Sequence, residues 1–375
     1  MKIVAIFNNK GGVGKSTLCF HLGHALSEMG KKVLLIDLDP QCNLTICGIK
    51  EDRLEKIWED EEKFIDDYGE MKNTDVEDVL SHFHSIHFLL KATEEGVDEL
   101  ETYPKPINLG ANLDLIPGRL SIHKFENKIA ERWSSIYQGD NLGIRTITNI
   151  RRICERYNEI NGYDYILIDT SPSLGILNKI IISTVDGFFI PTQPDMFSFY
   201  GIKNIGKSLS LWRKEFDMLT SILPSNKTKK FPKKSVQFIG FTLYNAKKKD
   251  SGNNKYKLAQ AHYTYALKIP ETIKKFISKE NIPSSIKDIS EPIGGVSIIH
   301  THNTFPSISQ LLKCPMWKIP EEYSNIKNNV SNLKELFPDD VNITQTINGQ
   351  SKTMRKIKDK YVEFANDFIR RTEHL

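Results

Sequence analysis

The chain has 375 residues, of which 39% are hydrophobic and 26% are charged, as in an ordinary globular protein. This length allows one large α/β domain or two smaller ones, and no stretch approaches the roughly 18 apolar residues that a membrane span needs. The five cysteines form no C-x-x-C pair, which argues against disulfides or structural zinc and favours a reducing cytoplasm. An apolar run begins at Ile3, so we expect no signal peptide.

The charge is unevenly distributed along the chain, although the formal net charge is only +4. Residues 1–200 contain 21 basic and 31 acidic side chains, whereas residues 201–300 contain 19 basic and 7 acidic ones. Residues 301–375 are nearly balanced, with 11 basic and 9 acidic side chains. This polarity is typical of a nucleotide-handling half joined to a surface that prefers polyanions.

Apolar runs alternate with helical patterns along the chain, which predicts an α/β fold with a mostly parallel central sheet covered by helices on both faces. The expected strands are 3–7, 32–37, 113–117, 163–169, 187–191 and 236–243. The expected helices are 18–29, 119–133, 143–160, 174–184, 201–216 and 352–371.

We expect residues 1–375 to form a single domain. The acidic segment at about 50–108 is weakly patterned, and we interpret it as an insertion of helices and loops. A divergent, polar segment at about 290–352 forms a C-terminal extension. Residues 224–235, with two prolines and five lysines, predict an exposed basic loop, which we call the lysine segment.

A glycine-rich motif connects the first predicted strand to the first predicted helix. Its glycines allow a loop whose N–H groups close around phosphate oxygens, and the helix N-terminus that follows favours negative charge. Lys15 supplies a positive charge to the β- and γ-phosphates, and the Ser16 hydroxyl is placed to ligate Mg²⁺. The motif therefore predicts nucleotide binding on a P-loop NTPase-like fold. Its residues are Lys10, Gly11, Gly12, Val13, Gly14, Lys15, Ser16 and Thr17.

The motif departs from the general pattern G-x-x-x-x-G-K-[ST], because Asn9 stands at the first glycine and Lys10 adds a second lysine. Lys15 already supplies a positive charge to the nucleotide of its own subunit. We therefore expect Lys10 to reach the phosphates of a nucleotide in a facing subunit. The alternative is a glycine-rich turn with an incidental lysine, and eight consecutive fitting residues between a strand and a helix argue against it.

Three aspartates lie at or just after the ends of the second and fourth predicted strands. Asp37, Asp39 and Asp169 therefore fall at the carboxyl edge of the parallel sheet, where ligands bind. Hydrolysis of a bound phosphate needs a phosphate cradle, Mg²⁺ and a group that positions water, and these carboxylates complete that set. We expect Lys10, Lys15 and Asp39 to be catalytic, and Ser16, Asp37 and Asp169 to hold the metal.

Several segments resemble the ParA family of deviant-Walker-A partition ATPases, in the wider ParA/MinD group. They are KGGVGKST, VLLIDLDPQCNLT, NLDLIPGRLSIHKFE, YDYILIDTSPSLGILNKIIISTVDGFFIPTQPDMFSFYGI and the closing YVEFANDFIRR. The resemblance implies a Mg²⁺- and ATP-dependent homodimer that binds DNA non-specifically in plasmid or chromosome partition, in the cytoplasm and on the nucleoid. It also implies a centromere-binding, ParB-like partner, or another activator, that stimulates slow hydrolysis and releases the dimer.

The resemblance assigns a role to each motif residue. Lys10 matches the signature lysine that crosses the dimer interface to the partner's nucleotide. Asp39 matches the aspartate needed for water activation, with Asp37 as its neighbour, and Asp169 matches the switch carboxylate of the metal's second shell. In the remaining matches, Lys15 binds phosphate, Ser16 ligates Mg²⁺ and Thr17 contacts phosphate.

Clustered lysines favour DNA binding independently of the resemblance. They can neutralise several phosphates in contacts that are sequence-independent and strongly salt-sensitive. A solvated lysine-rich surface is the alternative, and the sequence leaves both open. The lysines are Lys227, Lys229, Lys230, Lys233, Lys234, Lys247, Lys248, Lys249, Lys255 and Lys257.

Three other functions stay open as alternatives. A membrane-positioned ATPase of MinD type needs a terminal helix with a clean basic face, but residues 352–375 mix acids with bases, so we expect no stable membrane anchor. A metallo-chaperone or iron–sulfur relative needs paired cysteines. A ParA-like positional or regulatory ATPase for another cargo, or for a partner effector as in defence systems, is kept open by the divergent C-terminal third.

Overall fold

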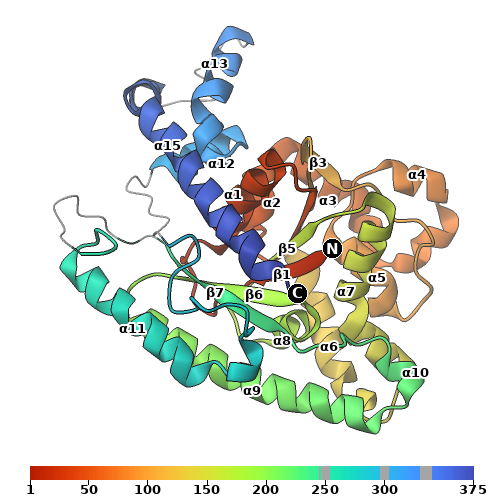
Figure 1. Cartoon of the computed structure of the whole chain (residues 1–375). Helices are drawn as coiled ribbons and strands as arrows, with labels where there is room; N and C mark the ends of the chain where they lie inside the picture. Colours follow the sequence, from red (N-terminus) through yellow and green to blue (C-terminus); the bar gives the residue numbers. More distant parts are fainter. Residues whose placement is uncertain (245, 247–253, 296–303, 330–339) are drawn as a thin grey trace.

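A seven-stranded sheet runs through the part of the chain that the structure describes (Figure 1). The computed structural model describes residues 1–244, 246, 254–295, 304–329 and 340–375. The strand order is β3-β4-β2-β5-β1-β6-β7; β3 is antiparallel to β4, and all other neighbours are parallel. The strands are β1 (Lys2–Ile6), β2 (Val33–Leu38), β3 (Ile107–Gly110), β4 (Leu113–Ile116), β5 (Tyr165–Thr170), β6 (Gly187–Thr192) and β7 (Gln237–Leu243).

Helices cover both faces of this sheet: α1 and α15 lie over one face, and α6, α8 and α9 lie over the other (Figure 1). Their bounds are α1 (Lys15–Glu28), α2 (Asn43–Gly48), α3 (Glu51–Asp66), α4 (Val76–Ser81), α5 (Ile86–Glu95), α6 (His123–Ile136), α7 (Asn141–Asn161), α8 (Ile176–Thr184), α9 (Met196–Ile222), α10 (Ser225–Thr228), α11 (Gln260–Phe276), α12 (Thr304–Leu312), α13 (Ile319–Asn329) and α15 (Asp340–Thr372).

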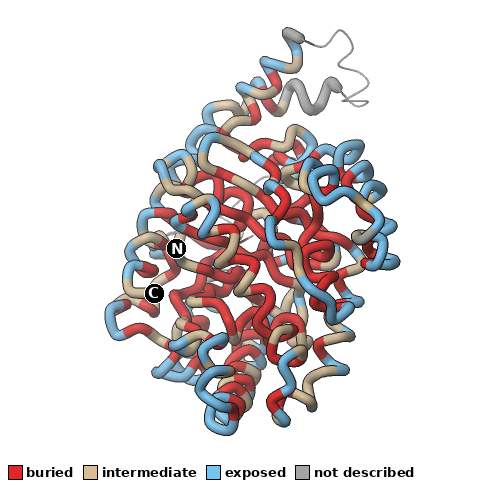
Figure 2. Tube along the Cα trace, turned by 90° about the vertical axis from the view of Figure 1, so that its right-hand side faces the viewer, coloured by how far each residue is buried: buried red, intermediate tan, exposed pale blue. Residues whose placement is uncertain are grey.

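The central strands are buried on both faces, which explains their continuous apolar runs. Every residue of β2, β5 and β6 is buried, and Figure 2 shows the buried residues filling the interior beneath an exposed outer layer. The predicted fold class is therefore confirmed. None of the helices that the structure describes has the length and hydropathy required of a membrane span.

The sheet register decides where the site forms. In the parallel pairing, Ile6 at the end of β1 and Asp37 at the end of β2 both lie beside Asp169 of β5. The three strands therefore finish at one edge, and the glycine loop that follows β1 lies over this edge. Residues from three distant parts of the sequence meet there for this reason.

Two predicted segments differ in detail from the structure. The insertion at 50–108 contains α3, α4 and α5, but it also ends in β3, an antiparallel edge strand of only 4 residues. A strand this short shows no clear periodicity, so the sequence pattern missed it. The lysine segment is not wholly an exposed loop, because it includes α10 and its Phe231 side chain is buried in the core.

Candidate nucleotide-binding site

The glycine loop needs glycine at two positions for backbone reasons. Gly12 and Gly14 have φ angles of 71° and 78°, in the left-handed region that side chains disfavour. A Cβ atom on Gly14 would also lie 2.1 Å from Cε1 of Tyr244, which packs over the loop. Gly14 is the N-cap residue of α1, so the loop passes directly into the helix N-terminus.

A cavity of about 290 Å³ opens between the loop and the carboxyl edge of the sheet. Most of the predicted motif residues line this cavity, and so does Asp39. Val13 is instead buried in the core, and Lys10 does not line the cavity. The lining residues are Gly11, Gly12, Gly14, Lys15, Ser16, Thr17, Asp39, Gln41, Asn43, Cys47, Pro172 and Gln310.

The Lys15 ammonium lies beneath the loop, with its Nζ 3.5 Å from the carbonyl oxygen of Lys10. Burial lowers the pKa of Lys15, whereas the nearby carboxylates of Asp169 and Asp39 raise it. A buried cation next to exposed loop N–H groups favours an anionic ligand. The geometry therefore suits the phosphates of a nucleotide.

Asp169 is completely buried, and within the described part of the chain neither of its carboxylate oxygens has a hydrogen-bond partner of regular geometry. Burial and the neighbouring Asp37 raise its pKa, while the Ser16 hydroxyl lowers it. A completely buried carboxylate with so little hydrogen bonding is costly unless a cation compensates it. Ser16 and Asp169 together therefore fit an oxygen-coordinated Mg²⁺.

The Asp37 carboxylate is already occupied by protein donors. It accepts hydrogen bonds from the N–H and hydroxyl of Thr45, at 2.8 and 2.7 Å, and from the N–H of Asp39 at 3.1 Å. Burial raises the pKa of Asp37 to about 6. These contacts hold the turn that carries Asp39, so a role of Asp37 as a metal ligand stays a prediction. Thr45 was not singled out from the sequence, although it lies in the segment that follows these aspartates.

The Asp39 carboxylate lines the cavity and accepts a hydrogen bond of 3.0 Å from the N–H of Gln41. Burial raises the pKa of Asp39, and the Lys15 ammonium acts against this shift. The structure thus places Lys15 and Asp39 on one cavity. Asp169 does not line this cavity, but its buried carboxylate is close enough to act on the Lys15 ammonium. The catalytic and metal-binding roles of these residues stay predictions.

Lys10 lies outside the cavity and contacts a different part of its own chain. Its ammonium forms an ion pair with Asp195 and donates to Oε1 of Gln193 at 3.3 Å. Asp195 is also the N-cap of α9, where it accepts a hydrogen bond of 2.9 Å from the N–H of Ser198. Sequence reasoning missed these partners, because they are some 185 residues away from Lys10.

The lysines predicted to contact DNA divide into four groups. Lys229, Lys230, Lys233 and Lys234 are exposed and line a second cavity of about 980 Å³ at the amino ends of β6 and β7. By contrast, Lys227 donates to the carbonyl of Gly139, and Lys255 pairs with Glu291 at 2.6 Å. Lys257 is exposed. Lys247, Lys248 and Lys249 lie outside the described residues.

Comparisons with known proteins show the family to which this chain belongs. A family model described as an AAA domain matches residues 1–222. The sporulation initiation inhibitor protein Soj of Bacillus subtilis is 31% identical over 218 residues, which are 58% of this chain and 68% of Soj. An uncharacterized protein of Mycobacterium tuberculosis is 29% identical over 202 residues, or 54% of this chain and 49% of that protein. The match thus spans only about half of this relative's length.

The solved structure of pNOB8 ParA bound to nonspecific DNA has the same fold. It superposes with a TM-score of 0.53 at 20% identity, covering 99% of this chain and 98% of that chain. The residues matched by the family model include the glycine loop, the three aspartates and strands β1 to β6. On this evidence the chain belongs to the AAA-domain family and is a P-loop ATPase of the ParA/MinD type.

Proposed function

We propose that this protein is a Mg²⁺-dependent ATPase that dimerises when it binds ATP, binds DNA non-specifically and acts in plasmid or chromosome partition. The observation that carries the proposal is that Lys15 and Asp39 line one phosphate-sized cavity, with the buried Asp169 carboxylate close to the Lys15 ammonium. The similarity to Soj, and to a ParA whose structure contains nonspecific DNA, supports it.

The residues at and beside the cavity have different roles in hydrolysis. The loop N–H groups and Lys15 bind the phosphates, and Ser16 and Asp169 hold Mg²⁺, which neutralises charge on the phosphates when it is bound. Asp39 lies at the cavity wall with one oxygen fixed by the Gln41 N–H. Its carboxylate orients the attacking water, because it is the one aspartate among the described residues that lines the cavity.

The surface beside Lys10 suits a second copy of the chain. Met196, Phe197 and Tyr200 at the start of α9 are 49%, 64% and 51% exposed. The Lys10 Nζ is 5.7 Å from the centre of the Phe197 ring, so the apolar side chains and this cation form one surface. Grouped exposed apolar side chains are typical of protein interfaces. In the dimer, Lys10 leaves Asp195 and reaches the phosphates of the partner's nucleotide.

The DNA-binding surface is formed by the four exposed lysines of the lysine segment, Lys229, Lys230, Lys233 and Lys234. Their cations neutralise DNA phosphates without reading the base sequence. A ParB-like, centromere-binding protein, or another activator, stimulates hydrolysis and thereby resets the dimer. Position on the nucleoid is in this way coupled to the nucleotide state.

Light scattering after size-exclusion chromatography, with ATP or ADP and with or without duplex DNA, tests this function. We expect the wild type to dimerise and bind DNA only with ATP and Mg²⁺. Lys15→Ala should abolish ATP binding, because it removes the buried cation of the cavity. Asp39→Ala should retain ATP binding, lose hydrolysis and accumulate as a dimer. Hydrolysis by Asp39→Ala at the wild-type rate would show that Asp39 does not activate water, and a monomer with ATP would contradict the proposed switch.

A further inference from the structure

The C-terminal extension packs directly against the nucleotide-binding elements. In Figure 1, α12 lies next to α2, although more than 250 residues separate the two helices in the sequence. Lys313, just after α12, donates to the carbonyl of Ile46 in α2 at 2.7 Å. Trp317 donates from its indole N–H to Glu28 at the end of α1 at 3.0 Å.

A buried histidine joins this extension to the first turn of α1. His21 Nε2 accepts a hydrogen bond of 3.1 Å from the N–H of Met316, so the ring proton is on Nδ1. This Nδ1–H donates to the carbonyl of Thr17 at 2.7 Å. Burial lowers the pKa of His21 to about 4, which keeps the ring neutral at pH 7. The imidazole therefore fixes the extension relative to the glycine loop.

The position of α12 is fixed as well. Phe305, Ile308 and Ser309 are buried on its inner face. The Ser309 hydroxyl donates to the carbonyl of Cys314 at 2.6 Å, and the N–H of Cys314 donates back to the Ser309 carbonyl at 3.2 Å. These two hydrogen bonds fix the chain at the C-terminal end of α12. The backbone that carries Gln310 is consequently held in place at the cavity.

Gln310 is the residue of the extension that lines the nucleotide cavity. Its side-chain amide is exposed and forms no hydrogen bond with any described residue, so its donors are available to a ligand. The other lining residues belong to the glycine loop and to the segments after β2 and β5, which form the phosphate end of the site. A neutral amide donates to phosphate oxygens without adding charge.

We propose that Gln310 donates a hydrogen bond to the phosphate chain of the nucleotide bound in its own subunit. The C-terminal extension then contributes a ligand-binding residue to the nucleotide site. This inference rests on the proposed ATP binding, and it adds a ligand residue that the glycine loop and the aspartates do not supply.

Titration with fluorescent ATP and ADP analogues tests the proposal in four proteins of full length: wild type, Gln310→Ala, Gln310→Glu and Ser307→Ala. Loss of a hydrogen bond to a charged group should weaken binding by Gln310→Ala about tenfold. Gln310→Glu should bind more weakly still, because its carboxylate repels phosphate. Ser307 is exposed on the same helix but does not line the cavity, so Ser307→Ala is the matched control and should bind like the wild type.

Wild-type affinity of Gln310→Ala and Gln310→Glu, or an equal loss in Ser307→Ala, would overturn the proposal. Thermal unfolding of each variant without nucleotide shows whether the helix itself has changed, because a folding defect lowers the unfolding temperature of the free protein. The outcomes are distinct from a failure of the proposed function. If the wild type itself binds no ATP, the proposed function is wrong; if only the Gln310 variants behave as wild type, this inference alone is wrong.

Discussion

Lys10 has two roles that compete for its single ammonium group. In the isolated chain it pairs with Asp195 and Gln193, close to the exposed Phe197. In the proposed dimer it binds the partner's nucleotide, so this intrachain pair must first break. The pair therefore stabilises the monomer against the dimer. Its contribution is modest, because both side chains are partly exposed to water.

Asp195→Asn should favour the dimer. The asparagine removes the negative charge that holds Lys10, yet it still accepts the N–H of Ser198 and keeps the cap of α9. We expect the ATP-dependent dimerisation constant to improve by up to about fivefold per subunit, as measured by sedimentation at several protein concentrations. Asp217→Asn, farther along α9, removes an equal charge far from Lys10 and serves as the control. Unchanged or weaker dimerisation of Asp195→Asn would show that the pair does not restrain Lys10.

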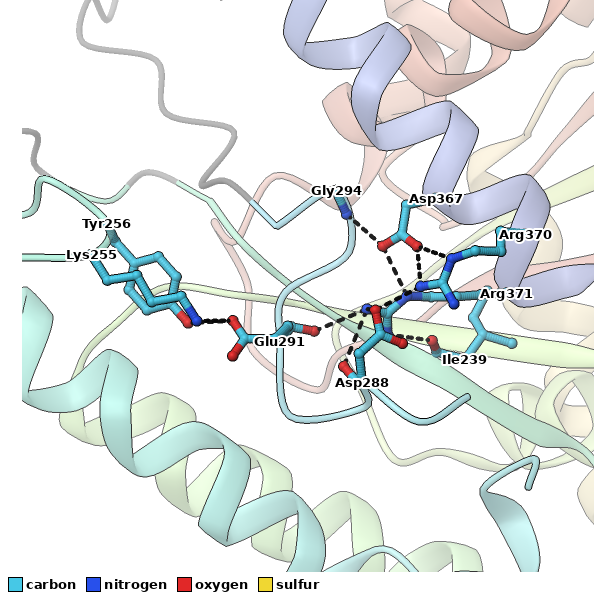
Figure 3. Close-up of polar contacts among 9 residues, drawn as sticks. All are labelled: Ile239, Lys255, Tyr256, Asp288, Glu291, Gly294, Asp367, Arg370 and Arg371. Atoms are coloured by element: carbon cyan, nitrogen blue, oxygen red, sulfur yellow. Dashed lines mark hydrogen bonds and ion pairs between the residues drawn. The ribbon is translucent and has the colours of Figure 1, made fainter. Parts of the chain in front are cut away.

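Helix α15 is attached to the sheet through a buried arginine (Figure 3). Arg371 donates from Nε to Asp367 at 2.9 Å and from its other nitrogens to the carbonyls of Ile239 and Glu291, each at 3.2 Å. Asp367 in turn accepts a hydrogen bond of 2.8 Å from the N–H of Gly294. One guanidinium therefore connects the last helix, β7 and the loop at 288–294.

Replacing this arginine should cost far more stability than replacing its neighbour. Arg371→Ala removes the buried cation that binds Asp367, and the carbonyls of Ile239 and Glu291 lose their bonds to the guanidinium, so we expect the free energy of unfolding to fall by about 3 kcal/mol. Arg370 binds Asp288 and Asp367 at the surface, where it is 48% exposed, so Arg370→Ala should cost less than about 1 kcal/mol. Urea denaturation of the two variants at pH 7 measures the difference. Equal losses would contradict the assignment of Arg371 as the residue that anchors α15.

The two proposed binding surfaces lie at opposite edges of the sheet. The nucleotide cavity lies at the carboxyl ends of β1, β2 and β5, whereas the exposed lysines lie at the amino ends of β6 and β7. Helix α9 connects these edges: it begins beside Lys10 and, after 27 residues or about 40 Å, ends next to the lysine segment. The basic lysine segment and the nucleotide cavity are thus separated in the fold, as the acidic and basic parts are in the sequence.

Charge reversal of Lys229, Lys230 and Lys233 to Glu should weaken duplex binding by the ATP-bound Asp39→Ala protein. Because each lost phosphate contact lowers the salt slope by about 0.9, we expect a reduction of about 2 to 3 in a plot of log affinity against log salt concentration. Lys227 is left unchanged, since it donates to Gly139 within the chain.

The matched control reverses three exposed basic residues of α15 to Glu, namely Lys352, Arg355 and Lys356, and changes the net charge equally. The control should bind DNA with a nearly unchanged salt slope. If both triple variants lose the same affinity, net charge alone governs binding and the lysine segment is not the DNA surface.

The local parts of the site could be predicted from the sequence. A buried strand, two glycines in left-handed conformations and a following helix are specified by neighbouring residues, so the loop and Lys15 lie where they were predicted. Asp39 and Asp169 were also placed correctly at the sheet edge, because parallel strands finish on the same side. The fold class follows from the same alternation of apolar runs and helices.

Contacts between distant segments could not be predicted in this way. The pairing of Lys10 with Asp195, the occupation of Asp37 by Thr45 and the arrival of Gln310 at the cavity each depend on how separate elements pack. The polar extension shows no strong periodicity, yet its few apolar side chains fix it against α1 and α2. The sequence by itself thus determined the phosphate-binding loop, because neighbouring residues set its backbone geometry. Only the tertiary structure decided which further side chains reach the site, because that depends on the packing of distant elements.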